Sequence, residues 1–181
     1  MSSEPVLPNR LRAPARVRPF HVVLVEPEIP PNTGNVARLC AATCCPLHLV
    51  GKIGFSIDAH AVRRAGLDYW PLVELHTHTD LGAAEAVIRE LAAPARPRSW
   101  LFSGKAGRSY LDVPFETGDA LVFGKESTGL GDELLDERKE FVVGIPTLGE
   151  VRSLNLANSA AIAVYEALRR IGALAPISVA R

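Results

Sequence analysis

Short runs of apolar residues alternate along this chain with amphipathic stretches, and loops rich in glycine and proline separate them. The run at residues 21–25, His-Val-Val-Leu-Val, is continuous, which is typical of a strand buried on both faces. The same kind of pattern predicts further strands at residues 47–50, 72–75, 100–103, 120–123 and 141–143.

The amphipathic stretches predict helices, and the clearest covers residues 155–171. Its apolar stripe consists of Leu156, Ala160, Ala163, Val164, Ala167, Leu168 and Ile171. Ser153 is the expected N-cap and Gly172 the expected end. Further helices are expected at residues 33–43, 58–64 and 80–91. Strands that alternate with helices predict an α/β fold, with a mostly parallel sheet and helices on both faces.

A chain of 181 residues is expected to form a single domain, at residues 20–173. Residues 1–19 contain prolines, arginines and few large apolar side chains, which predicts a disordered tail. Residues 174–181 are expected to form a C-terminal tail.

Composition narrows the functional classes. The 20 basic and 20 acidic residues cancel, so RNA binding would require local basic patches. No apolar run approaches the length of a membrane span and no signal peptide is recognisable, so we expect a cytoplasmic protein without a membrane partner. The three cysteines suit free thiols in a reducing compartment.

Loops at residues 26–34, 124–131 and 144–154 are rich in Gly, Asn and Pro, and each follows a predicted strand. Because ligands of parallel α/β sheets bind outside the carboxyl ends of the strands, we expect these loops to form one crevice. Ser153 and Asn155 stand where the last loop meets its helix, and helix capping and ligand contact explain them equally well.

Several common sites are excluded. Residues 118–127 only approach the phosphate-binding loop pattern, and the dinucleotide fingerprint and the Gly-x-Ser-x-Gly elbow are absent. His76 and His78 have no third ligand nearby, so they are expected at the surface and no metal site is predicted.

The loop Pro30-Pro-Asn-Thr-Gly-Asn-Val-Ala-Arg38 is more specific. Asn32 or Thr33 can cap the helix, while Arg38 projects fixed donors near its N-terminus, where a phosphate or a ribose could bind. A surface arginine beside a capped helix is the alternative for this loop taken alone.

Three segments together resemble the SPOUT superfamily of S-adenosylmethionine-dependent RNA methyltransferases, in particular its SpoU class. They are Asn32-Thr-Gly-Asn-Val-Ala-Arg38, Phe123-Gly-Lys-Glu-Ser-Thr-Gly-Leu130, and the stretch at residues 145–158 that contains Arg152-Ser-Leu-Asn-Leu-Ala-Asn158. The segments at residues 26–35 and 63–69 are similar to the TrmL-type enzymes, which methylate the wobble-position ribose of tRNA. The resemblance covers residues 21–172.

The resemblance implies a C-terminal trefoil knot and an obligate homodimer with a shared active site. It implies a cofactor pocket lined by Phe102, Gly124, Glu126, Ile145, Ser153 and Leu154. The matching catalytic set is Arg38, Ser153 and Asn155. Because a guanidinium does not readily accept a proton, we interpret Arg38 as a clamp for phosphate or ribose.

The function implied is transfer of a methyl group from S-adenosyl-L-methionine to the 2′-hydroxyl of cytidine or uridine 34 of tRNA, with S-adenosyl-L-homocysteine as product. The residues expected to contact RNA are Asn32, Arg38, Arg63, Arg64 and Lys105. Two alternatives stay open: a non-catalytic RNA-binding protein of the same fold, and a methyltransferase that acts on another tRNA position or on ribosomal RNA.

Overall fold

A computed structural model describes residues 10–55, 69–175 and 178–180. Its centre is a six-stranded sheet in the order β4-β3-β2-β6-β5-β7, in which every neighbouring pair is parallel. The strands are β2 (His21–Val25), β3 (Leu47–Val50), β4 (Leu75–His78), β5 (Ser99–Phe102), β6 (Ala120–Phe123) and β7 (Val142–Val143).

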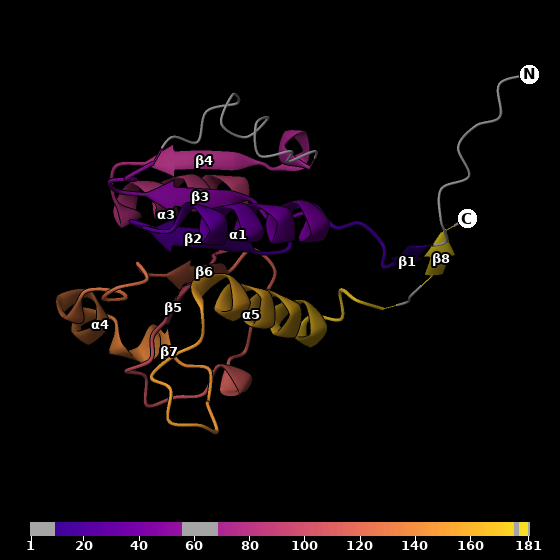
Figure 1. Ribbon diagram of the computed structural model, residues 1–181. Helices are drawn as coiled ribbons and strands as arrows, with labels where there is room; N and C mark the ends of the chain where they lie inside the picture. The colour runs from indigo at the N-terminus through magenta and orange to yellow at the C-terminus, as the bar shows by residue number, and fades with distance from the viewer. Residues whose placement is uncertain (1–9, 56–68, 176–177, 181) are drawn as a thin grey trace, which may run out of the picture.

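Helices cover both faces of this sheet (Figure 1). On one face, α1 (Pro30–Thr43) and α5 (Leu156–Arg170) pack on alternate residues of β2, β3 and β6. On the other face, α3 (Leu81–Leu91) and α4 (Asp132–Glu137) pack on the residues in between. Three short segments are single turns of 3-10 helix: η1 (Trp70–Leu72), η2 (Tyr110–Asp112) and η3 (Lys139–Phe141). The predicted α/β fold with a parallel sheet is therefore confirmed.

The predicted bounds hold best where the local pattern is strong. β2, β3 and β6 have the predicted ranges, and Asp80 caps α3 by accepting from Ala83 N at 2.9 Å. β4 lies later than predicted, because residues 70–72 form η1, whose second residue is a proline. α1 begins at Pro30 rather than at residue 33, since the fixed φ of proline suits a first helical turn.

The predictions for three helices need correction or are not tested by the structure. Ser153 is not the N-cap of α5; Asn155 takes that position. The short acidic helix α4 was not predicted. The helix expected at residues 58–64 lies outside the described residues.

The chain termini contain more structure than the sequence suggested. β1 (Arg10–Arg12) pairs antiparallel with β8 (Ser178–Ala180), and this small sheet lies apart from the body (Figure 1). Nearer the sheet, Arg18 Nε donates to both carboxylate oxygens of Glu74 at 2.9 and 3.0 Å. The expected domain limits at residues 20–173 remain a prediction. Among the described residues, no helix is long and apolar enough to cross a bilayer.

Histidines form an unpredicted hydrogen-bonded chain across β2, β3 and β4. His21 Nδ1 lies 3.0 Å from His48 Nε2, and His48 Nδ1 lies 2.9 Å from His78 Nε2. His76 stacks on His48 with ring centroids 4.8 Å apart. His76 and His78 are therefore half-buried parts of a cluster rather than isolated surface residues. In the part of the chain that the structure describes, no group of His, Cys, Asp or Glu is arranged to hold a metal ion.

Candidate functional site

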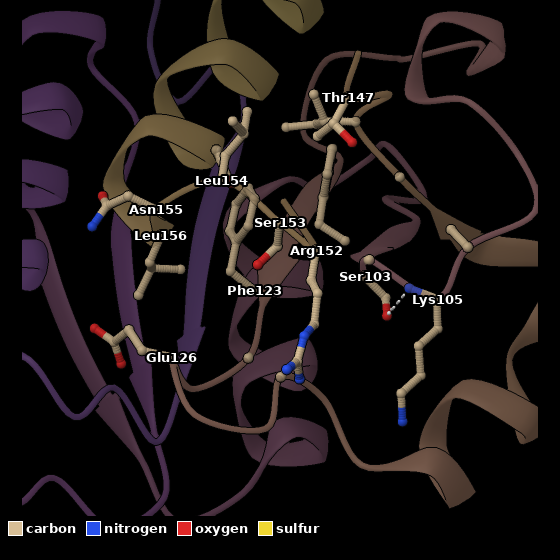
Figure 2. A pocket seen from close by; sticks show the side chains of 18 of the residues that line it. Ser103, Lys105, Phe123, Glu126, Thr147, Arg152, Ser153, Leu154, Asn155 and Leu156 are labelled. Carbon is tan, nitrogen blue, oxygen red and sulfur yellow. Dashed lines mark hydrogen bonds between the residues drawn. The ribbon is translucent and has the colours of Figure 1, made fainter. Parts of the chain in front are cut away.

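The loops that follow β2, β5, β6 and β7 enclose a cavity of about 910 Å³ at the carboxyl edge of the sheet. The sequence-predicted residues that line it are Asn32, Phe102, Lys105, Gly124, Glu126, Ile145, Ser153, Leu154 and Asn155. Figure 2 shows Glu126, Ser153, Leu154 and Asn155 grouped around this space, although they come from separate loops. The expectation that the loops share one crevice is confirmed.

Glycines let the loops approach one another where side chains would not fit. A Cβ on Gly124 would lie 2.1 Å from the carbonyl carbon of Gly129 and 2.3 Å from Leu130 N. A Cβ on Gly144 would lie 3.0 Å from Ser103 O. The loops therefore pack backbone against backbone at Gly124 and Gly144, and this close packing sets the shape of the cavity wall.

Glu126 joins the loop after β6 to the start of α1. Its carboxylate accepts hydrogen bonds from Glu28 N at 2.8 Å, from Ile29 N at 3.3 Å and from Asn32 Nδ2 at 2.8 Å. Burial alone would raise the pKa of this carboxyl, but the hydrogen bonds outweigh burial and lower the pKa below its ordinary value. Glu126 is therefore an ionised anchor at neutral pH and a weak proton acceptor.

A second set of contacts holds the same two loops from the opposite direction. The Glu28 carboxylate accepts from Ser127 N and from Ser127 Oγ, both at 2.9 Å. Lys125 Nζ lies 2.7 Å from Glu26 Oε2. Each loop thus supplies a carboxylate that accepts backbone N–H groups of the other loop.

Asn155 connects α5 to this network. Its Oδ1 caps α5 by accepting from Ala157 N at 2.9 Å and from Asn158 N at 3.3 Å, while its Nδ2 donates to Asn32 Oδ1 at 3.0 Å. Both reasons to expect Asn155, capping and contact with the site, are therefore satisfied by one side chain. Ser153 differs, because its hydroxyl makes no hydrogen bond within the described residues and is exposed in the cavity.

The basic residues are placed less uniformly. Lys105 lines the rim and forms an ion pair with Asp132. Arg38 is not among the cavity residues; its guanidinium carbon lies 5.4 Å from the ring centroid of Tyr69 on the exposed side of α1. Arg63 and Arg64 lie outside the described residues.

Sequence reasoning predicted Lys105 but missed the rest of the loop after β5. Residues 103–109 line the cavity, and Gly144 N donates to Arg108 O while Tyr110 N donates to Gly144 O. The glycines at positions 104 and 107, directly after a predicted strand, were an available signal. Arg152 also lines the cavity and was not singled out.

Comparison with known proteins identifies the family to which the chain belongs. Residues 19–165 match the SpoU rRNA methylase family. The chain belongs to this family. A relative from Saccharophagus degradans, named tRNA (cytidine(34)-2'-O)-methyltransferase, is 45% identical over 156 residues, which cover 84% of this chain and 96% of the relative.

Solved structures agree with this assignment. One, described as "Structural insights into the 2-OH methylation of C/U34 on tRNA", has a TM-score of 0.75 and 42% identity, and the match covers 84% of this chain and 96% of that chain. The SpoU methyltransferase AviRb from Streptomyces viridochromogenes, in complex with AdoMet, has a TM-score of 0.71 and 25% identity, over 88% of this chain and 64% of that chain. The predicted SpoU resemblance is confirmed.

Proposed function

We propose that this protein is an S-adenosylmethionine-dependent tRNA 2′-O-ribose methyltransferase that acts on the wobble nucleotide, cytidine or uridine 34. The observation that carries the proposal is the single cavity in which Asn32, Glu126, Ser153 and Asn155 meet. The names of its relatives at about 45% identity give the substrate. A tRNA substrate also implies that the protein works in the cytoplasm.

The cavity suits the cofactor, because its wall combines closely packed loops at Gly124 and Gly144 with apolar side chains such as Phe102, Ile145 and Leu154. The residues that would hold the cofactor are Phe102, Gly124, Glu126, Ile145, Ser153 and Leu154. When bound, S-adenosyl-L-methionine supplies a methyl group on a sulfonium, and S-adenosyl-L-homocysteine is the product. Phe102 stacks on Phe123 at 4.8 Å, so its ring is held in place at the cavity wall.

The protein's own task is to position the ribose hydroxyl. Asn155 is fixed by its bonds to α5 and to Asn32, whereas the Ser153 hydroxyl is unengaged within the described residues. We therefore assign hydroxyl orientation to Ser153 and give Asn155 the role of fixing the backbone from which Ser153 projects. Glu126 keeps Asn32 in place for Asn155.

A homodimer with a shared site explains the position of Arg38. This arginine is exposed on α1 and does not line the cavity of its own chain, so a second subunit would have to bring the two together. The exposed Ile162 and Tyr165 on α5 are apolar side chains that such an interface would cover. In the dimer we assign Arg38 to the RNA, together with Lys105, Arg63 and Arg64. Asn32, which the sequence also predicted to contact RNA, is buried and its amide is bonded to Glu126 and Asn155, so we assign it to holding Asn155.

The trefoil knot is also part of this proposal. It is supported by the close passage of Gly144 between backbone groups of Arg108 and Tyr110, and by the donation from Arg170 to Leu111 O. These contacts bring the segments on either side of the cavity against the loop after β5.

The test is methyl transfer by the full chain from labelled S-adenosyl-L-methionine to total tRNA of a strain that lacks this enzyme, followed by mapping of the label. We expect label at nucleotide 34. Arg38→Ala should reduce turnover at least 100-fold, while calorimetry with S-adenosyl-L-homocysteine should show unchanged affinity.

Other outcomes identify the alternatives. Label at another nucleotide, or in ribosomal RNA, would show that the protein is a methyltransferase with a different target. Absence of S-adenosyl-L-homocysteine binding by the unmodified protein would favour a non-catalytic RNA-binding protein. A parallel loss of cofactor affinity in Arg38→Ala would contradict the role given to Arg38.

A further inference from the structure

The rim of the cavity carries several basic side chains, and most are engaged within the protein. Lys105 forms an ion pair with Asp132, and Lys125 forms one with Glu26. Arg108 donates to two backbone carbonyl groups, at 3.0 and 3.4 Å. These cations help to hold the loops together, and a ligand that binds them must compete with their protein partners.

Arg152 is different. It is exposed, it lines the cavity, and its guanidinium has no hydrogen-bond or ion-pair partner among the residues that the structure describes. In Figure 2 its side chain extends from the chain next to Ser153 into the space framed by the loops of Glu126 and Lys105. Arg152 is therefore the direct neighbour in sequence of Ser153, whose hydroxyl we assign to orient the ribose hydroxyl.

The backbone beneath this side chain is held in place. A Cβ on Gly104 would lie 3.1 Å from Arg152 O, so the loop after β5 packs directly against residue 152. The Arg152 side chain therefore extends from a backbone that is packed against the cavity wall.

Among the described residues, the charges around Arg152 leave it without a counter-ion. Glu126 is the acidic residue of the cavity wall, and its carboxylate already accepts three N–H donors from the start of α1. A guanidinium presents a planar fork of donors that matches an oxyanion, and phosphate is bound by such a fork through two parallel hydrogen bonds.

We propose that Arg152 binds a backbone phosphate next to the ribose that is methylated, and so positions that ribose for Ser153. This inference deepens the proposed function and rests on it. The 2′-carbon of a ribose neighbours the carbon that carries the 3′-phosphate, so fixing that phosphate restricts where the 2′-hydroxyl can lie. The carboxylate of the methyl donor has the same oxyanion chemistry, and the experiment must separate the two sources.

The experiment compares the unmodified protein with Arg152→Ala, Arg152→Lys and the matched control Arg89→Ala. Arg89 is an exposed arginine of α3 that does not line the cavity. For each protein, tRNA affinity is measured over a range of salt concentrations, S-adenosyl-L-homocysteine affinity by calorimetry, and kcat and KM with tRNA.

For Arg152→Ala we expect tRNA affinity to fall about 10- to 100-fold. The slope of log affinity against log salt should decrease by about one ion, while S-adenosyl-L-homocysteine affinity stays within about twofold. Arg152→Lys should recover the salt slope but only part of kcat/KM, because an ammonium lacks the planar fork. Arg89→Ala should leave all three quantities unchanged.

Two results would overturn the assignment. A loss of S-adenosyl-L-homocysteine affinity with unchanged tRNA affinity would show that Arg152 binds the carboxylate of the cofactor and not a phosphate of the RNA. Unchanged values in Arg152→Ala, or an equal loss in Arg89→Ala, would show that Arg152 makes no specific contact. Failure of the proposed function would be seen in a different measurement, the position of the methyl label in tRNA treated with the unmodified protein. The comparison of tRNA affinities between variants is valid whichever tRNA nucleotide is modified.

Discussion

Two regions of one parallel sheet each hold a connected polar network, and the networks are built in opposite ways. We call the loops at the carboxyl edge the loop half and the histidines of β2, β3 and β4 the histidine half. At the carboxyl edge, Glu126, Asn32 and Asn155 are joined across separate loops and face a cavity. Within β2, β3 and β4, His21 and His48 are fully buried and hydrogen-bonded ring to ring with His78. The first network centres on a charge, while the second requires neutral rings.

Burial explains the difference. Desolvation lowers the pKa of His21 to about 4 and that of His48 to about 2. At His48 the neighbouring histidines add to the effect, whereas at His21 the Glu74 carboxylate opposes it and the charges of Arg18 and His76 add to it. In the loop network, N–H donors lower the pKa of Glu126 in spite of burial. The stability contributed by the histidine network should therefore begin to fall below pH 6.5, where the carboxylate of the site is still ionised, so stability and site geometry can be separated experimentally.

Gly124→Ala should have the largest effect, and only on the loop half. The new Cβ would meet backbone atoms at 2.1 and 2.3 Å, so the loop after β6 must move and the cavity must change shape. We expect S-adenosyl-L-homocysteine affinity to fall by at least 100-fold and methyl transfer to be undetectable, as measured by calorimetry and by label incorporation.

Gly131→Ala is the matched control, because a Cβ there meets nothing within 4 Å. It should keep cofactor affinity within a few-fold. The pH dependence of unfolding, which belongs to the histidine half, should be the same in both variants; a changed pH profile in Gly124→Ala would mean that the two halves are not independent.

The histidine half is broken by acid. Both folded-state pKa values lie below the ordinary value of 6.5, so the unfolded chain binds more protons between pH 6.5 and about 4. The stability contributed by the neutral rings is complete above pH 6.5 and is lost as the pH falls. Each of the two histidines should contribute a slope of about 1.4 kcal/mol per pH unit in that window. Urea unfolding at several pH values measures the slope.

His48→Gln should flatten this slope even though it lowers stability at pH 8, because the ring contacts of His48 are also lost. Glu126→Gln serves as the comparison from the other half. Since the pKa of Glu126 lies below its ordinary value of 4.5, the Gln variant should keep the full slope between pH 6.5 and 5. An equal slope in His48→Gln and the unmodified protein would contradict the assignment of the acid sensitivity to the histidine chain.

The sequence predicted the elements whose signals are local. β2 and β6 are continuous apolar runs, and α5 has an apolar stripe at helical spacing, so their ranges were close to those observed. It also placed the loops of the site at one edge, because parallel strands end together. α4 was missed because its six residues are mainly acidic and too few to establish a periodicity.

Contacts between distant residues could not be predicted in the same way. Ser153 and Asn155 are both good N-cap residues, and the choice of Asn155 coincides with a hydrogen bond to Asn32, 123 residues away. The histidine chain depends on the register that sets His48 opposite His76, which no single strand encodes. Arg152 could not be selected from the sequence, because it differs from the other basic residues at the rim only in lacking a partner among the described residues.

The smallest expected effect concerns the reciprocal contacts that join the loops of the site. Ser127→Ala removes the hydrogen bond from Ser127 Oγ to Glu28 Oε1 but leaves the bond from Ser127 N to Glu28 Oε2, each 2.9 Å long. Because the lost bond is exposed and water can replace it, we expect a change of about 0.5–1 kcal/mol in unfolding free energy and less than a threefold change in S-adenosyl-L-homocysteine affinity. Glu28→Ala removes both bonds and should weaken cofactor affinity more, measured by the same calorimetry. If Ser127→Ala proved as damaging as Glu28→Ala, the backbone bond would contribute little, and the loop half would depend on side chains much as the histidine half does.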